Sequence, residues 1–84
     1  MSKNFIYELD TIAIRVKAAR TAKGYSQLAL AEKAGTSRST ISRIEKGESY
    51  FNLITLVKIA DALDISFSDL MGQDFFLKDL KKSS

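Results

Sequence analysis

The stretch from Ser37 to Lys46 gathers side chains that donate and accept hydrogen bonds. Arg38 and Arg43 carry guanidinium groups, and most of the residues between them carry hydroxyls. A guanidinium presents its N–H groups as a planar fork that matches paired acceptor atoms. The chain contains no His and no Cys, which excludes imidazole and thiolate mechanisms and ordinary zinc sites. The residue types therefore favour binding over catalysis, and we expect no cofactor and no metal.

Two short helices joined by a tight turn are expected to hold this stretch. Ser26 suits the N-cap of the first of these helices, and Gly35 can adopt the left-handed conformation that ends it. Thr36 or Ser37 then caps the second helix, which is expected to run to about Lys46. A connection of three residues is typical of a helix-turn-helix unit.

Further helices are expected over residues 10–23, 53–63 and 66–71. The helix over 53–63 has the strongest amphipathic pattern, with apolar residues at i, i+3, i+4 and i+7 spacing: Leu53, Leu56, Val57, Ala60 and Leu63. The chain contains no proline, and five helical patterns follow one another. The predicted fold class is therefore all-α.

The 84 residues are enough for one domain. We expect residues 1–9 to form an N-terminal arm, residues 10–72 to form the domain and residues 73–84 to form a C-terminal tail. The core is expected to contain Leu30, Ala31, Ile41, Ile44, Leu56 and Leu63. No apolar run approaches the roughly 20 residues that span a bilayer, so the expectation is a cytoplasmic protein without a membrane partner.

Positive charge is concentrated in one part of the chain. The net charge is +3 overall, but residues 15–46 contain eight basic residues against two acidic ones, a local charge of +6. A basic region on a small domain favours a polyanionic partner. A solvated, Lys-rich face is the alternative interpretation of the charge alone.

Three motifs follow one another: RxxKGxSQ at 20–27, LAxKAGxSRSTISRIEKG at 30–47 and LxxLxxIAxALxIS at 53–66. Over roughly residues 10–71 the chain resembles the Cro/C1-type (XRE-like) helix-turn-helix domain of bacterial and phage transcriptional regulators. The resemblance implies a five-helix repressor-like domain that binds double-stranded DNA.

The helix that begins near Ser37 is the expected reading helix, because the major groove admits an α-helix and displays a distinct pattern for each base pair. The resemblance implies that Arg38, Ser39 and Arg43 read base edges, with Thr40 as a weaker reader. A purely solvated or phosphate-bound role for the two arginines stays open.

Gln27 lies in the first turn of its helix, where free backbone N–H groups and the helix dipole attract phosphate. The resemblance implies that Gln27 clamps the DNA backbone. Further phosphate contacts are expected from Ser26, Ser37, Lys46, Ser49 and Tyr50, although the first role of Ser26 and Ser37 is that of helix caps.

Arg20 and Glu45 occupy positions at which the family places a partly buried ion pair. By resemblance, this pair ties the first helix to the end of the reading helix. We expect it to be structural, since loss of one partner would leave a poorly solvated charge.

Apolar residues at expected surface positions indicate a partner surface. Family members commonly have polar residues where this chain has Ile14 and Ile54, and Pro where it has Phe51. A homodimer would use this surface, and its two-fold symmetry would place two reading helices about 34 Å apart. The candidate dimer residues are Ile54, Phe75, Phe76 and Leu80. The alternative is that the apolar tails fold back on their own domain.

The sequence thus predicts a dimeric, sequence-specific transcriptional regulator that binds an inverted-repeat operator. Within the family, restriction-modification controller proteins and small phage repressors are the first expectation. Two alternatives stay open: an antitoxin whose apolar tails bind a toxin, and a protein-interaction module that no longer binds DNA. An enzyme is not expected.

Overall fold

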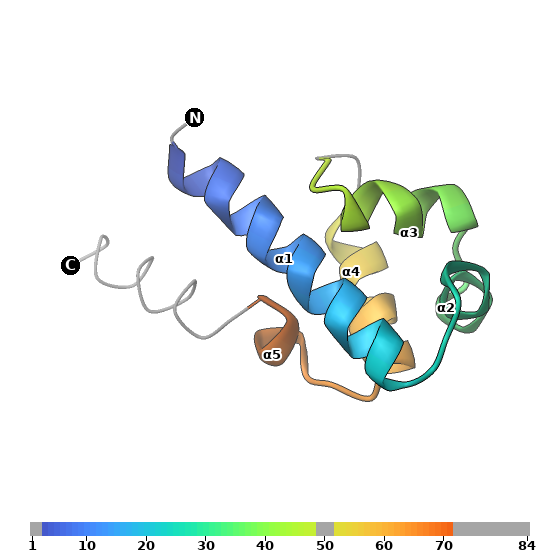
Figure 1. The fold of residues 1–84 in the computed structure, drawn as a ribbon. Helices are drawn as coiled ribbons and strands as arrows, with labels where there is room; N and C mark the ends of the chain where they lie inside the picture. The colour runs from blue at the N-terminus through green and yellow to red at the C-terminus, as the bar shows by residue number, and fades with distance from the viewer. Residues whose placement is uncertain (1–2, 49–51, 72–84) are drawn as a thin grey trace.

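The computed structural model describes residues 3–48 and 52–71, and all regular structure in these residues is helical (Figure 1). The five helices are α1 (Lys3–Ala22), α2 (Gln27–Ala34), α3 (Arg38–Glu45), α4 (Leu53–Ala62) and α5 (Phe67–Met71). The predicted all-α, five-helix class is therefore confirmed.

Local signals set the boundaries of the four later helices. A short polar side chain caps each N-terminus by accepting a hydrogen bond of 2.8–3.1 Å from the backbone N–H three residues further on. The capping residues are Ser26, Ser37, Asn52 and Ser66. Gly35 ends α2 in the left-handed conformation, with φ at 69°. The predicted three-residue connection between α2 and α3 is confirmed.

Helix α1 begins at Lys3, several residues before the predicted start at Asp10 or Thr11. Neither Pro nor Gly occurs between Lys3 and Ala22, so nothing in the local sequence interrupts the helix. Asp10 and Thr11, which looked like N-caps, therefore lie inside α1.

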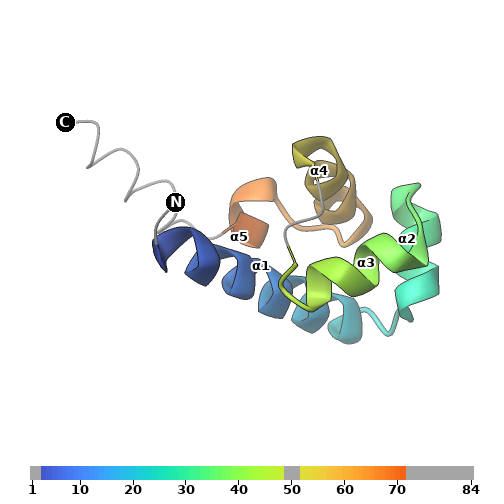
Figure 2. The ribbon, with the colours of Figure 1, turned by 90° about the horizontal axis from the view of Figure 1, so that it is seen from above.

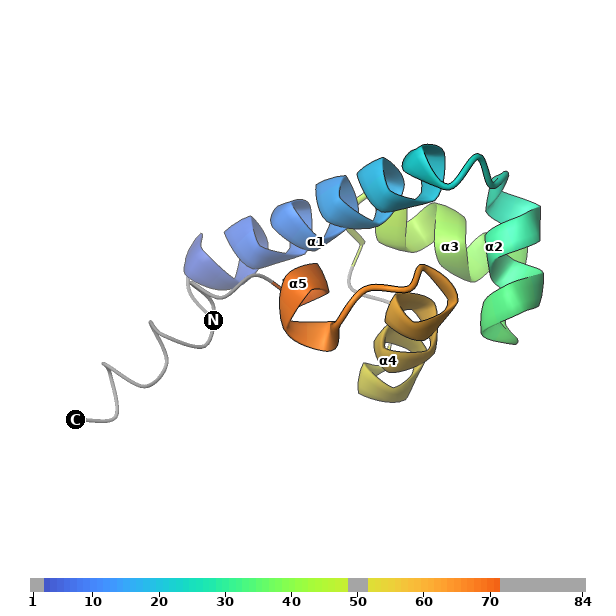
Figure 3. The ribbon, with the colours of Figure 1, turned by 90° about the horizontal axis from the view of Figure 1, so that it is seen from below.

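The helices pack around one core. Helix α1 packs against α3 and α5, α2 against α3 and α4, and α4 against α5. In Figure 1, α1 crosses the front of the domain and α4 lies behind it, whereas the view from below in Figure 3 shows α4 and α5 on the same side of α1. All six predicted core residues are buried, as are Val16, Ile59 and Leu70.

The buried face of α4 differs from the expected one. Leu56, Ile59 and Ala60 are almost fully buried, whereas Leu53 is 62% exposed and Val57 is 47% exposed. Like the predicted stripe, the buried stripe has helical spacing, at positions 56, 59, 60 and 63. It packs against α2 and α5. Leu53 and Val57 lie beside it and remain in contact with solvent.

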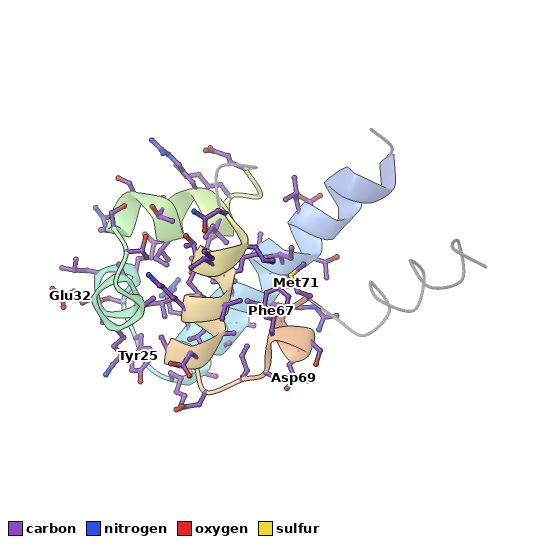
Figure 4. All side chains as sticks on the ribbon, turned by 180° about the vertical axis from the view of Figure 1, so that it is seen from behind. Tyr25, Glu32, Phe67, Asp69 and Met71 are labelled. Carbon is purple, nitrogen blue, oxygen red and sulfur yellow. The ribbon has the colours of Figure 1, made fainter. Side chains whose placement is uncertain are left out.

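Helix α5 closes the core at the end of the described chain. Figure 4 shows Phe67 and Met71 directed toward the middle of the domain and Asp69 directed outward. Met71 is buried, and Phe67 packs against the core cluster. Among the helices of residues 3–48 and 52–71, none combines the length and apolar character that crossing a membrane requires.

Candidate nucleic-acid interface

The outer face of α3 carries an open hollow of about 210 Å³. Its lining residues share one stripe of the helix: Arg38, Ser39, Ser42, Arg43 and Lys46. Three of these side chains are basic and none is acidic. In the view from above in Figure 2, no described helix crosses in front of α3. The face is therefore positively charged, rich in hydrogen-bonding groups and open to a large ligand.

Two isoleucines orient this helix. Ile41 is fully buried and Ile44 is 1% exposed, and both belong to the core cluster to which α1, α2, α4 and α5 also contribute. Because these two side chains point into the core, the stripe that begins at Arg38 must face outward. Burial of two isoleucines thus fixes the rotation of α3 about its own axis.

The start of α3 is held by its cap. Ser37 Oγ accepts a hydrogen bond from the backbone N–H of Thr40 at 3.1 Å, and the two hydroxyl oxygens lie 2.9 Å apart. Thr40 does not line the hollow. The structure therefore groups Arg38, Ser39 and Arg43 but places Thr40 with the cap.

Arg20 and Glu45 form a paired contact between α1 and α3. Arg20 Nε lies 2.6 Å from Glu45 Oε2, and Arg20 Nη2 lies 3.0 Å from Glu45 Oε1. The side chains are only 13% and 4% exposed. The hydrogen bonds to Glu45 raise the pKa of Arg20 above its ordinary value. This planar, two-point contact fixes the end of α3 against α1.

Gln27 lies in the first turn of α2, as expected, and its side chain contacts Glu45. Gln27 Nε2 donates a hydrogen bond of 3.1 Å to Glu45 Oε1, so the amide joins the ion pair. The nearby Ser26 hydroxyl caps α2. Spacing along the sequence did not predict the Gln27–Glu45 contact, because it joins two helices.

Ser42 lines the hollow but was absent from the predicted reading residues. Its signal was present in the sequence, since positions 38, 42 and 46 follow one another at i+4 intervals on one face of a helix. Lys46, predicted as a phosphate contact, lines the same hollow. Ser49 and Tyr50 lie outside the described residues, as do Phe75, Phe76 and Leu80.

A second feature of the surface is exposed apolar area on α4. Ile54 is 66% exposed and lies beside the exposed Leu53 and Val57 on the same helix. Ile14 on α1 is 69% exposed, and Leu28 on α2 is 52% exposed. The sequence analysis predicted Ile14 and Ile54 as exposed apolar residues. It did not predict the exposure of Leu28, Leu53 and Val57.

The family comparison covers most of the domain. Residues 16–70 match the model of the helix-turn-helix family. This segment extends from Val16 within α1 to the penultimate residue of α5 and includes the whole lining of the hollow.

Among curated relatives, the chain is 38% identical over 69 residues to the immunity repressor protein of Bacillus phage phi105. The match covers 82% of this chain but 48% of the repressor, so the chain spans about half the length of that relative.

Two solved structures resemble the fold and the sequence together. The restriction-modification controller protein C.AhdI from Aeromonas hydrophila has a TM-score of 0.72 and 38% identity, with coverage of 76% of this chain and 97% of the other. The biofilm master regulator SinR in complex with DNA has a TM-score of 0.66 and 40% identity, with coverage of 70% and 95%.

Proposed function

The chain belongs to the helix-turn-helix family, and we propose that it is a transcriptional regulator that binds an inverted-repeat operator as a homodimer. The family and the named relatives support a DNA-binding regulator rather than an enzyme. The observation that carries the proposal is the open basic hollow on α3, whose five lining residues face away from the core.

In the proposed complex, α3 enters the major groove, which is wide enough for an α-helix. Arg38 and Arg43 can each donate paired hydrogen bonds to guanine O6 and N7, and Ser39 and Ser42 supply short donors and acceptors between them. Thr40 has its hydroxyl beside the cap, so its proposed contribution is limited to a methyl or edge contact.

Phosphate contacts are proposed for the flanks of the reading face. The N-terminus of α2 offers backbone N–H groups and the positive end of the helix dipole, and Gln27 stands beside them. Lys46 lies at the other end of the hollow. Such contacts fix the position of the protein on the duplex without reading sequence. Phosphate contacts from Ser49 and Tyr50 remain predictions.

The dimer contact is proposed to use the exposed apolar face of α4, where Ile54 adjoins Leu53 and Val57. A two-fold axis through this face would present two copies of α3 to successive major grooves, about 34 Å apart. The roles of the tail residues Phe75, Phe76 and Leu80 remain predictions, as does the boundary between domain and tail.

Selection from a random pool of duplexes by the purified protein tests this function. The expected result is an enriched inverted repeat with half-sites about one helical turn apart, bound by two protomers. Enrichment of a single half-site would contradict the dimer. Failure to enrich any sequence would contradict sequence-specific regulation and favour the interaction-module alternative. The antitoxin alternative would require a toxin partner that co-purifies with the chain.

A further inference from the structure

Glu45 has three donors around its carboxylate and is almost completely shielded from solvent. Oε2 accepts from Arg20 Nε at 2.6 Å, and Oε1 accepts from Arg20 Nη2 at 3.0 Å and from Gln27 Nε2 at 3.1 Å. The Glu45 side chain is 4% exposed. Its charge is balanced by Arg20, so Glu45 can lie beside a DNA-binding residue without presenting a bare negative charge to phosphate.

We infer that Glu45 is a positioning residue for Gln27, holding its side-chain amide so that one Nε2–H group remains directed to a DNA phosphate. This inference rests on the proposed DNA-binding function. A carboxylate accepts hydrogen bonds and donates none, so only the nitrogen end of the amide can face it. The nitrogen carries two N–H groups, and Glu45 engages one of them. The other is left as a donor for phosphate, which only accepts.

Arg20 completes the arrangement from the opposite side. Its Nη1 donates to the backbone oxygen of Tyr25 at 2.9 Å, just before the Ser26 cap of α2. Arg20 thus holds both the carboxylate of Glu45 and the chain that leads into α2. The start of α2, the end of α3 and the Gln27 amide are fixed relative to one another before DNA is present. Fixing the amide in advance reduces the entropy lost on binding.

A double-mutant cycle separates positioning from a purely structural role. Binding to a duplex of random sequence is measured for Gln27→Ala in three backgrounds: wild type, Glu45→Ala and Arg20→Lys. Arg20→Lys weakens the two-point contact between residue 20 and Glu45 but retains the Glu45 carboxylate for Gln27. We expect Gln27→Ala to weaken binding about 3- to 10-fold in the wild-type and Arg20→Lys backgrounds, and to have almost no effect in Glu45→Ala. Equal losses in all three backgrounds would overturn the inference.

A second measurement requires neither DNA nor a substituted protein. In the NMR spectrum of the free wild-type protein, the two side-chain amide protons of Gln27 are expected to differ in their solvent exchange, beyond the shift difference that restricted rotation about the C–N bond gives every primary amide. The proton that faces Glu45 should lie downfield and exchange more slowly with solvent than its partner. Two protons that both have ordinary glutamine shifts and both exchange fast with solvent would overturn the inference while leaving the proposed operator binding intact. A protein with the expected amide spectrum that binds no duplex would instead overturn the proposed function, together with the phosphate contact.

Discussion

Gly47 lies so close to Asp10 that a Cβ atom on Gly47 would stand 2.9 Å from Asp10 Oδ1. The φ angle of Gly47 is 80°, a conformation that side chains with a Cβ rarely adopt. The chain reverses here directly after α3, and the Glu48 N–H donates back to the Arg43 carbonyl oxygen at 3.1 Å. The end of α3 thus lies against α1 at a position whose backbone conformation favours glycine.

Gly47→Ala is therefore expected to lower the free energy of unfolding by about 1–2 kcal/mol through the left-handed backbone alone, with only a small further loss from the Asp10 contact, because the exposed Asp10 carboxylate can move aside. Gly24→Ala is the matched control, because φ is 75° there and a Cβ would meet nothing within 4 Å. Denaturant unfolding measures both. Adding Asp10→Ala to Gly47→Ala should remove the excess over Gly24→Ala. An equal cost for the two single variants would show that the Asp10 contact has no effect.

The Arg20–Glu45 ion pair between α1 and α3 gives a second prediction. Arg20→Met would leave Glu45 almost buried without its cation, and the expected loss is about 3 kcal/mol of unfolding free energy. The matched variant is the double substitution Arg20→Met with Glu45→Leu, which removes both charges. Denaturant unfolding should find the double variant more stable than Arg20→Met. The opposite order would mean that the unpaired carboxylate is not the source of the loss.

A pH-dependent contribution is expected from Lys23 and Asp64, whose Nζ and Oδ2 atoms lie 2.5 Å apart on the surface. The hydrogen bond lowers the pKa of Asp64 and raises the pKa of Lys23. Because the folded-state pKa of Asp64 is below its unfolded value, its contribution is present above that unfolded value, about 3.9, and is lost as the pH falls through the folded value. For Lys23, the contribution is lost as the pH rises through its raised folded value.

Asp64→Asn tests this pair, because Asn also tolerates the positive φ of 58° at this position. The variant is expected to be slightly less stable than the wild type at pH 7. The difference should shrink as the pH falls below about 4 and also in high salt, which screens exposed charges. A difference that is constant from pH 7 to acid pH would contradict the ion-pair explanation.

Much of the fold was predictable because its signals are local. Ser26, Gly35 and Ser37 define the ends of α2 and α3 through hydrogen bonds to neighbouring backbone groups, so residue type and spacing are sufficient. The start of α1 was not predictable in this way. Asp10 is a good capping residue, but a helix continues through it when no residue before it stops the helix.

Two of the errors in the prediction come from relationships between helices. Two overlapping stripes of α4 have helical spacing, and only the positions of α2 and α5 decide that Ile59 is buried and Val57 is exposed. The contact between Gln27 and Glu45 likewise depends on how α2 meets α3. Ser42 is different, since its place on the Arg38 stripe could have been read from the sequence.

Ile54→Lys is expected to shift the proposed dimer toward monomers. Burying an isoleucine side chain stabilises an interface by about 1.5–3 kcal/mol. Replacing Ile54 by a charged residue should therefore weaken association at least about tenfold. Leu28→Lys is the control, since Leu28 is also exposed and apolar but lies on α2. Sedimentation velocity without DNA distinguishes the two. An unchanged profile for Ile54→Lys would remove Ile54 from the interface.

The most direct test of base reading by α3 uses the Arg43→Ala variant. The measurement is the difference in binding free energy between the selected operator and a scrambled duplex, compared with that of the wild type. Arg43 lines the hollow, and loss of a paired guanine contact should reduce discrimination by about 1–3 kcal/mol. Gln27→Ala, by contrast, should weaken binding to both duplexes alike. Equal losses on operator and scrambled DNA for Arg43→Ala would contradict the assignment of α3 as the reading helix.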